Sequence, residues 1–337
     1  MTGLLAPSYT VTLGGQRWTE QALAVDVRLR AAPVVDVATV RLPAGAPLDA
    51  AVGDPAVVEL DGGEGGATVF TGTVQAIRRT PSSITVTAMN GGGALAAFRP
   101  AATYEQVTAG TVIRSLCGDA GATAGDVDDG VALAYYVADP ARTALEHVAR
   151  LAGWGGALAR VDGDDRLDVT VVNAVQPELA LRYGRDLLAV EQAEAAAPVE
   201  SFVVAGEAGA DSTSAPQALR ATTDFFGGSR PDGPSASSRW RFEPALRTAS
   251  AAKTAGAALG RSYRGSRRRG AITAVVQPSL RPGSVLELQD LPDGLDGGPA
   301  WADRVDHHVS AAGATTRARL WQGGDSFDPT AFLGGLV

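Results

Sequence analysis

The chain has 337 residues, of which 45% are apolar, so it is long enough to form two or three domains with buried cores. Its formal net charge is -8 at pH 7. A field of that sign repels phosphate backbones and anionic lipid surfaces, which argues against a general nucleic-acid or anionic-membrane binder. Stable membrane insertion is not expected either, because the sequence has no apolar run of the length that a membrane helix needs.

The first part of the chain is predicted to be antiparallel β-structure. Apolar and polar side chains alternate with period two at 9–13 and 23–30, a pattern typical of half-buried strands. Further strands are expected at 34–42, 57–60, 68–78 and 84–89, separated by turns rich in Pro, Gly and Asp. We therefore expect a tube-like antiparallel β-barrel domain over residues 1–100.

The periodicity becomes helical after residue 100. One helix is expected between Thr108, as its N-terminal cap, and Gly121, as its stop. A second is expected from Asp139, as the cap, to Gly153, with Pro140 in the first helical position. A hairpin should follow at 157–171. These elements predict an α+β insert of two helices and a hairpin over residues 101–178.

The remainder, residues 179–337, is predicted to be a second tube-like β-barrel domain with additions. A strand is expected at 199–205, and the Gly-, Ser- and Pro-rich stretch 206–238 predicts a long loop. An alanine-rich helix should occupy 249–263. Strands then resume at 271–277, 285–289, 300–309 and 315–322. The predicted fold class is mainly β with an α+β insert, with two tube-like antiparallel β-barrel domains per chain.

Two distant stretches have the same pattern and indicate an internal duplication. Gly53–Leu60 and Gly283–Leu288 are each a glycine turn that leads into an apolar strand carrying an acid. Each is followed by a strand with an aromatic residue, at Phe70–Val74 and at Trp301–Val305. A doubled β-unit would let three chains present six similar units in one ring.

No catalytic, cofactor or metal site is expected from the histidines and the cysteine. His147 falls near the buried stripe of the second helix, where a structural role is favoured over catalysis. His307 and His308 are adjacent in a strand, so they point to opposite faces and cannot share a metal. Cys117 is the single cysteine, and its place on a buried helical face favours an inert thiol.

Aspartate clusters and glycine runs are also explained by turn chemistry. Asp126, Asp128 and Asp129 form one cluster, and Asp162, Asp164 and Asp165 form another. Calcium is the alternative for both, but neither has the full loop pattern with a terminal glutamate. The glycine runs match neither a P-loop nor a dinucleotide-binding motif.

A run of arginines is the sharpest charge feature of the sequence. It consists of Arg261, Arg264, Arg267, Arg268 and Arg269. No aromatic platform for bases accompanies it, so a solvated rim or a surface for an acidic neighbour in an assembly is favoured over nucleic acid.

The expected localisation is cytoplasmic. A single cysteine allows no internal disulfide, and the amino-terminal residues have neither the basic start nor the apolar core of a signal peptide. No apolar run approaches the roughly 20 residues that a membrane helix needs.

Several motifs together resemble the late-control protein D family of phages. The run Tyr104–Ile113, the segment Asp139–Gly155 and the strand pair after it are similar to the insert of that family. Phe70-Thr71-Gly72 and Pro282-Gly283 stand where the family has its Phe-x-Gly and Pro-Gly turns. The individual motifs are short, and their order along the chain is the specific part of the resemblance.

The resemblance implies a non-enzymatic baseplate hub of a contractile phage tail or injection system, related to the amino-terminal part of type VI secretion spikes. Such hubs are homotrimers that adapt a hexameric inner tube to a trimeric spike, assembled in a tail-like particle with other baseplate proteins. No long β-helical repeat follows Gln322, so the spike is expected to be a separate protein. The apolar residues Phe332, Leu333, Leu336 and Val337 are the candidate docking segment for it, with a frayed terminus as the alternative.

Two other classes of function remain open at the level of sequence. A tail-associated cell-wall hydrolase would use aspartates of the insert, and it would need two carboxyl groups with separated pKa values in one cleft. A carbohydrate-binding β protein would need exposed aromatic residues, but aromatic residues make up only 6% of the chain.

Overall fold

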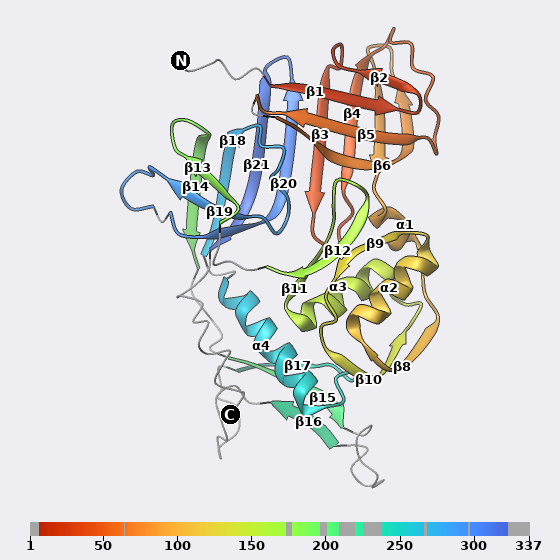
Figure 1. Ribbon diagram of the computed structural model, residues 1–337, viewed down its shortest axis with the longest axis vertical. Coiled ribbons are helices and arrows are strands. Elements are labelled where there is room, and N and C mark those ends of the chain that lie inside the picture. The colour runs from red at the N-terminus through yellow and green to blue at the C-terminus, as the bar shows by residue number, and fades with distance from the viewer. Residues whose placement is uncertain are drawn as a thin grey trace.

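The computed structural model describes residues 7–63, 65–172, 177–195, 201–208, 220–224, 238–265, 268–295 and 297–322 (Figure 1). The protein is mainly β, with antiparallel pairing throughout most of its largest sheet, and it carries an α+β insert. The predicted fold class is confirmed in these respects. None of the helices among the described residues combines the length and the apolar character needed to cross a bilayer.

The first group of strands, called the first β-unit below, precedes the insert. Its strands are β1 (Ser8–Leu13), β2 (Gln16–Trp18), β3 (Ala24–Arg30), β4 (Val37–Pro43), β5 (Pro55–Asp61), β6 (Gly66–Arg79) and β7 (Ser83–Met89). In space they follow the order β3-β4-β7-β6-β5-β1-β2. The alternation read from the sequence is real, because Val25, Val27 and Leu29 are buried while Arg28 between them is exposed.

The second group, called the second β-unit below, follows the insert. Its strands are β13 (Leu179–Arg182), β14 (Leu187–Glu194), β18 (Arg268–Val275), β19 (Val285–Gln289), β20 (Ala300–Ser310) and β21 (Gly313–Gln322). They lie in the order β14-β18-β21-β20-β19-β13. The short β2 is left out of the comparison. If the other strands of each unit are then numbered in chain order, the two units have the same spatial order of strands.

The two glycine turns that suggested the duplication are also equivalent in three dimensions. Gly53 donates its N–H to the carbonyl of Val74 at 2.9 Å, and the Val74 N–H donates to the carbonyl of Asp54 at 2.8 Å. In the second β-unit, Gly283 donates to Ala302 at 2.7 Å, and Ala302 donates back to Ser284 at 2.9 Å. Gly53 and Gly283 have φ of 98° and 90°, a conformation that favours glycine. One pairing differs between the units, because β1 is antiparallel to β5 whereas β13 is parallel to β19.

The described strands do not form two separately closed barrels. The two β-units join edge to edge through β3 and β20, which pair antiparallel within one 13-stranded sheet (Figure 1). A strand has two hydrogen-bonding edges, and β3 uses one on β4 and the other on β20. Since β3 has no edge left for β1, the first β-unit cannot close on itself through these two strands.

The insert is more elaborate than the two helices and hairpin predicted for it. It contains α1 (Gly92–Ala97), β8 (Ala102–Thr108), α2 (Ala109–Ala120), β9 (Thr123–Val127), β10 (Ala132–Ala138), α3 (Ala144–Gly155), β11 (Ala157–Val161) and β12 (Arg166–Val171). The hairpin β11–β12 is present, and β9 extends it as a third, parallel strand. The pair β8–β10 brackets α2 in the chain and was not expected from the sequence.

The helix ends confirm one prediction and correct another. Helix α2 begins after Thr108, whose hydroxyl accepts from the N–H of Thr111, and ends at Gly121 with a left-handed φ of 72°. For α3 the predicted cap Asp139 and first residue Pro140 are wrong. Thr143 is the cap, and Thr143 and Glu146 form a capping box in which each side chain accepts from the other's backbone N–H.

A third small unit packs against the insert. It consists of β15 (Ser201–Ala208), β16 (Arg220–Asp224), β17 (Ser238–Phe242) and α4 (Ala249–Gly265). The helix predicted at 249–263 is present, but β16 lies inside the stretch 206–238 that was predicted to be loop. Residues 209–219 and 225–237 of that stretch lie outside the described part of the chain.

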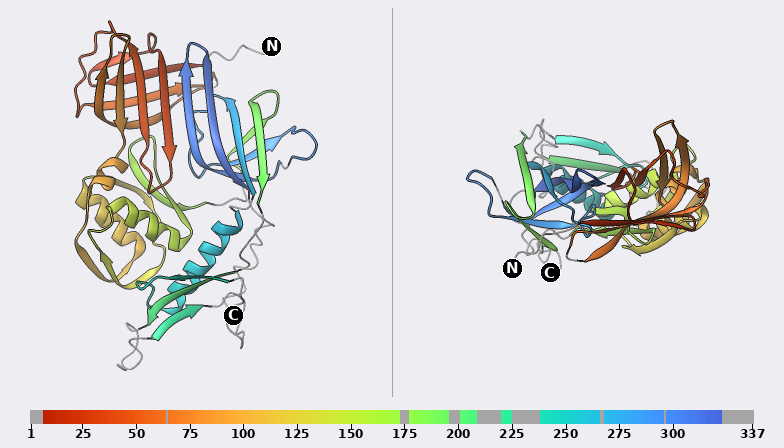
Figure 2. Two further views of the ribbon diagram at one scale, coloured as in Figure 1. Left: turned by 180° about the vertical axis from the view of Figure 1, so that it is seen from behind. Right: turned by 90° about the horizontal axis from the view of Figure 1, so that it is seen from above.

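Two hydrophobic cores result from this arrangement. One is shared by the two β-units, and the other joins the insert to the unit that contains α4, through Val204, Leu246 and Ala255. Figures 1 and 2 place the insert and α4 together beyond one end of the strands. The division into three domains at residues 100 and 178 remains a prediction.

A buried polar junction lies where the insert meets the β-units. The carboxylate of Asp36 is 3% exposed and accepts from the Arg30 N–H at 2.5 Å and from Asn90 Nδ2 at 2.7 Å. Burial raises the pKa of Asp36 to about 7, although these hydrogen bonds and the charge of Arg281 act in the opposite direction. Arg281 of the second β-unit donates to the carbonyls of Thr68 and Val69 in β6.

The glycine turn can be tested with Gly53→Ala. Open space surrounds the added methyl group, so the cost comes only from the positive φ and should be about 1–2 kcal/mol in the free energy of unfolding. Gly15→Ala is the matched control, because that glycine also faces open space but has no positive φ. Chemical denaturation measures both, and equal stabilities of the two variants would contradict the assignment.

The Asp36 junction predicts a pH dependence. The folded state keeps this carboxyl protonated up to about pH 7, whereas the unfolded chain releases the proton near pH 4, so this group lowers stability as the pH rises between those values. Asp36→Asn should therefore flatten the fall in the free energy of unfolding between about pH 4 and pH 7. Parallel curves for the variant and the parent protein would show that Asp36 is not the titrating group.

Candidate assembly interface

The junction between the two β-units is a ladder of main-chain pairs reinforced by charged side chains. It runs from Arg304 opposite Arg30 to Ser310 opposite Ala24. Arg30 Nη2 lies 2.6 Å from Asp306 Oδ1, and the same guanidinium donates to the Val305 carbonyl at 3.1 Å. A strand-to-strand contact of this kind can join two folded units without any further domain between them.

The two histidines of β20 occupy opposite faces of this junction, as the sequence predicted. His307 is 2% exposed, and its Nδ1 lies 2.9 Å from Thr316 Oγ1. Burial lowers the pKa of His307 to about 3, so the ring is neutral near neutral pH. His308 is on the exposed face, with its Nδ1 at 2.7 Å from Asp26 Oδ1.

A bulge marks the point at which β20 changes partners. The register between β20 and β21 shifts between Ala302 and Arg304, and beyond the shift the other edge of β20 pairs with β3. The register between β6 and β7 shifts in the same way between Val74 and Ala76. Val74 and Ala302 are equivalent through their glycine turns, so the two bulges are equivalent as well.

Beyond its bulge, β6 has an edge that no described strand covers. Residues 76–79 pair with β7 on one side only, whereas the equivalent residues of β20 pair on both sides. The side chains of Ala76, Arg78 and Arg79 are exposed. This edge carries two positive charges.

Strand β14, the equivalent of β3, is at the opposite end of the described sheet. It pairs with β18 on one side, and no described strand pairs with the other. Its exposed residues include Leu188, which is 55% exposed, and the acids Glu191 and Glu194. Open edges of this kind are normally covered by another chain or protected from one.

These edge residues were not singled out in the sequence. The sequence contains a signal for them in its internal duplication. Extending the match between Gly53–Leu60 and Gly283–Leu288 into the strands that follow aligns β6 with β20. That comparison would have shown that one member of the pair has a partner strand which the other lacks.

The described side chains of the arginine run lie on two elements, α4 and β18. Arg268 Nε lies 3.5 Å from Glu194 Oε1 in the neighbouring strand, and Arg269 follows it in β18. Arg261 is on α4, beside Gly156 at the end of α3. The side chain of Arg264 and the whole of Arg267 lie outside the described residues, as do Phe332, Leu333, Leu336 and Val337.

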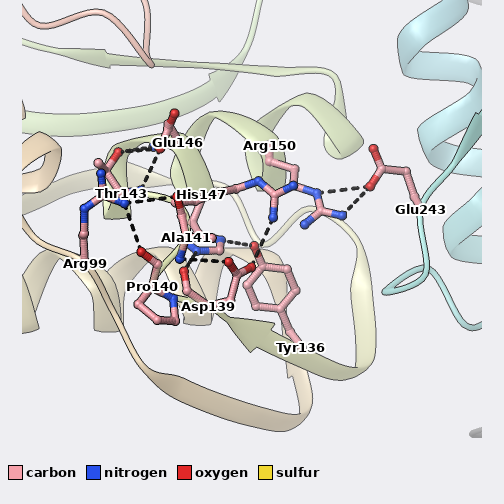
Figure 3. A network of polar contacts seen from close by, with 11 residues as sticks. Arg99, Tyr136, Asp139, Pro140, Ala141, Thr143, Glu146, His147, Arg150 and Glu243 are labelled. Carbon is pink, nitrogen blue, oxygen red and sulfur yellow. Dashed lines mark hydrogen bonds and ion pairs between the residues drawn. The ribbon is translucent and has the colours of Figure 1, made fainter.

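The contacts of His147 indicate a structural role for this residue (Figure 3). The ring is fully buried, its Nδ1 lies 2.6 Å from the Tyr136 hydroxyl, and its Nε2 lies 3.0 Å from the carbonyl of Asp139. A neutral ring satisfies both contacts when Nε2–H donates to the carbonyl and Nδ1 accepts from the hydroxyl. Burial raises the pKa of Tyr136 to about 12. Both ring nitrogens are therefore engaged, which does not suit a general base.

A charged network joins the insert to the segment that follows β17 (Figure 3). Glu243 is 4% exposed and accepts from Arg150 through Nε at 3.1 Å and Nη2 at 2.5 Å. Its other oxygen accepts from Arg241 Nε at 2.7 Å. Arg150 also lies over the ring of Trp154 at 4.9 Å from the centroid. The network lines a cleft of about 590 Å³, in which Glu243 is held by two arginines.

The aspartate clusters take part in turns and strand ends. Asp162 Oδ1 accepts from the N–H groups of Asp164 and Arg166, both at 2.9 Å, and Asp165 accepts from the N–H of Gly91. Asp128 Oδ2 accepts from the N–H of Val171 at 3.0 Å. No group of three potential metal ligands occurs within the described ranges.

Cys117 lies on the buried face of α2, as predicted. It is 1% exposed, and burial raises the pKa of its thiol to about 11. The thiol is therefore protonated near neutral pH and is a poor nucleophile.

Several solved structures share this fold, and they include proteins described as tail proteins. The 43 kDa tail protein of prophage MuSo2 from Shewanella oneidensis is similar over 94% of this chain and 98% of its own, with a TM-score of 0.69 and 15% identity. A tail protein from Neisseria meningitidis MC58 is similar over 94% and 96% of the two chains, with the same TM-score and identity. An Escherichia coli component of the type VI secretion system, described as similar to T4 tail proteins gp27 and gp5, is similar over 94% and 77%, with a TM-score of 0.60 and 9% identity.

No protein-family model matches the chain, and no curated protein matches its sequence. At identities this low, the similarity establishes the fold. The resemblance to phage tail proteins and to type VI secretion proteins that was drawn from the sequence is thus confirmed at the level of the fold.

The charged network predicts a stability effect for Glu243→Gln. The change leaves Arg150 and Arg241 without a carboxylate at a buried position, which should lower the free energy of unfolding by about 2 kcal/mol. Glu20→Gln, at an exposed residue, is the control and should have little effect. A thermal shift of Glu243→Gln no larger than that of the control would mean that the network does not hold the two parts together.

Proposed function

We propose that the protein is a structural, non-enzymatic component of a phage tail or of a related contractile injection particle. In this proposal three copies form a ring that presents six similar β-units. The ring contacts a hexameric inner tube on one side and a separate trimeric spike protein on the other, with other baseplate proteins around it.

The identical strand order of the two β-units is the observation that carries this proposal. A chain with two equivalent units and complementary open edges can repeat its internal junction with the next copy, which gives a head-to-tail contact. Such contacts form a closed ring when the rotation between units divides the circle, and three chains with two units each then match a sixfold tube. The fold shared with known tail proteins supports the same reading.

The polar sites of the insert fit a mechanical role better than an enzymatic one. A hydrolase would need two carboxyl groups aimed into one cleft, whereas Asp128, Asp162 and Asp165 each accept hydrogen bonds from backbone N–H groups in turns or at strand ends.

The arginine run and the carboxy-terminal segment belong to the same proposal. Arg268 and Arg269 lie in the strand next to β14, and an acidic neighbour in the particle is the proposed partner of the run. The segment that contains Phe332, Leu333, Leu336 and Val337 is the proposed docking site for the spike.

The stoichiometry of the assembly tests the function. The full chain, purified together with the spike protein from the same genome, should give three copies of each by native mass spectrometry. It should release no soluble fragments from peptidoglycan. A stable monomer that degrades peptidoglycan would favour the hydrolase instead and would contradict the proposed role.

A further inference from the structure

We infer that neighbouring copies join through an antiparallel strand pair between β6 of one copy and β14 of the next, with Arg78 opposite Ala193. The inference rests on the proposed ring of copies, and it adds the surface, the direction and the register of the contact. It is argued from the two halves of this chain alone.

The first step aligns β6 with β20. Val74 and Ala302 exchange equivalent hydrogen bonds with their glycine turns, and each is followed by the bulge. Beyond the bulge, Ala76 therefore corresponds to Arg304. Continuing along the strands, Arg79 corresponds to His307.

The second step aligns β14 with β3 through the strands between them. Ala88 lies opposite Val74 and Leu320 lies opposite Ala302, so these two residues are equivalent. Across the next pairing, the partners of Ala88 and Leu320 are Ala38 and Gly270.

The partners of those two residues complete the alignment. Val27 lies opposite Ala38, and Gln192 lies opposite Gly270. Gln192 is thus the equivalent of Val27. Both side chains point toward the interior face, because Val27 is buried and Gln192 is half-buried between exposed neighbours.

The third step transfers the register of the in-chain junction. His307 lies opposite Val27 within the chain. Replacing each residue by its equivalent places Arg79 opposite Gln192 of the next copy. Arg78 then lies opposite Ala193, and Thr80 lies opposite Glu191.

The charges of the two edges agree with this register. In an antiparallel pair, long side chains also reach the diagonal position two residues along the facing strand. Within the chain this is how Arg30 meets Asp306, which lies opposite Arg28. Between copies, Arg78 is diagonal to Glu191 on the opposite side of its direct partner from the in-chain case, and both side chains are exposed with no ion pair to another described residue. Arg79 is diagonal to Glu194, which already lies near Arg268 of its own chain.

A second copy of this chain is the occupant that these observations select. The same molecule supplies both edges, one basic and one acidic, and it already contains the junction that the contact would repeat. A strand from a different protein is the competing occupant of either edge, and the experiment below separates the two cases.

Cysteine pairs test the register. The full chain with Arg78→Cys and Ala193→Cys, oxidised at concentrations where it assembles, should give covalent dimers and then trimers, with no larger species because the ring closes at three. Arg78→Cys with Gln192→Cys is the matched control, since the second cysteine then faces the other side of the sheet. It should cross-link at least about tenfold less. The parent chain, with only the buried Cys117, should not cross-link.

A charge exchange tests the same contact without oxidation. Arg78→Glu or Glu191→Arg alone should weaken the association between copies about tenfold, more strongly at low salt, and the double exchange should restore it. Restoration by the double variant is the result that a merely unstable single variant would not give.

The outcomes separate this inference from the proposed ring. Trimers that form without the cross-link between residues 78 and 193 would overturn the strand pairing and leave the proposed ring in place. A strand of a different protein found on the open edge of β6 or β14 would have the same meaning. Covalent chains that extend beyond three copies would support the pairing and overturn the closed ring. A chain that remains monomeric in every condition would overturn both.

Discussion

The architecture depends on one constraint. Each β-strand has two hydrogen-bonding edges, and an unpaired edge either leaves backbone N–H and C=O groups without protein partners or tends to pair with another chain. Strand β3 gives one edge to β4 and the other to β20, so the first β-unit does not close through β1 and β3 and instead continues into the second. By the same rule, β14 and the part of β6 beyond its bulge each have one edge that pairs with no described strand. Among the described strands the sheet thus has one basic and one acidic open edge, on which the proposed contact between copies rests.

The second core gives that segment a rigid support. The insert and α4 share apolar side chains, and the pair Arg150 and Glu243 fixes one part against the other. At the other boundary, Asp36 in the loop between β3 and β4 accepts from Asn90, and Arg281 of the second β-unit donates to the carbonyls of Thr68 and Val69 in β6. The junction strand β3 is thus held at its carboxyl end by Arg30, which contacts both Asp306 and Asp36.

Much of this architecture could be predicted from the sequence where a local pattern had one physical solution. The alternation in β3 and the caps of α2 follow directly from residue type. The sequence also predicts the same turn at Gly53 and Gly283, and their equivalent hydrogen bonds confirm it. The start of α3 was misplaced because two start signals compete. Asp139 with Pro140 offers a single cap, whereas Thr143 with Glu146 makes two reciprocal bonds, and the second arrangement forms. The strands β8 and β10 were missed because their pairing joins segments on either side of α2, which local periodicity does not reveal. The open edges of β6 and β14 could not be recognised without knowing which strands pair.

Electron microscopy of the purified oligomer, at a resolution that traces strand direction, is the most direct measurement of the central claim. The account predicts a threefold ring in which the described sheet continues without interruption from β14 of one copy into β6 of the next, antiparallel and in the register of the in-chain junction. A map in which β14 faces solvent inside an assembled ring, or in which the copies meet through the insert instead, would contradict it.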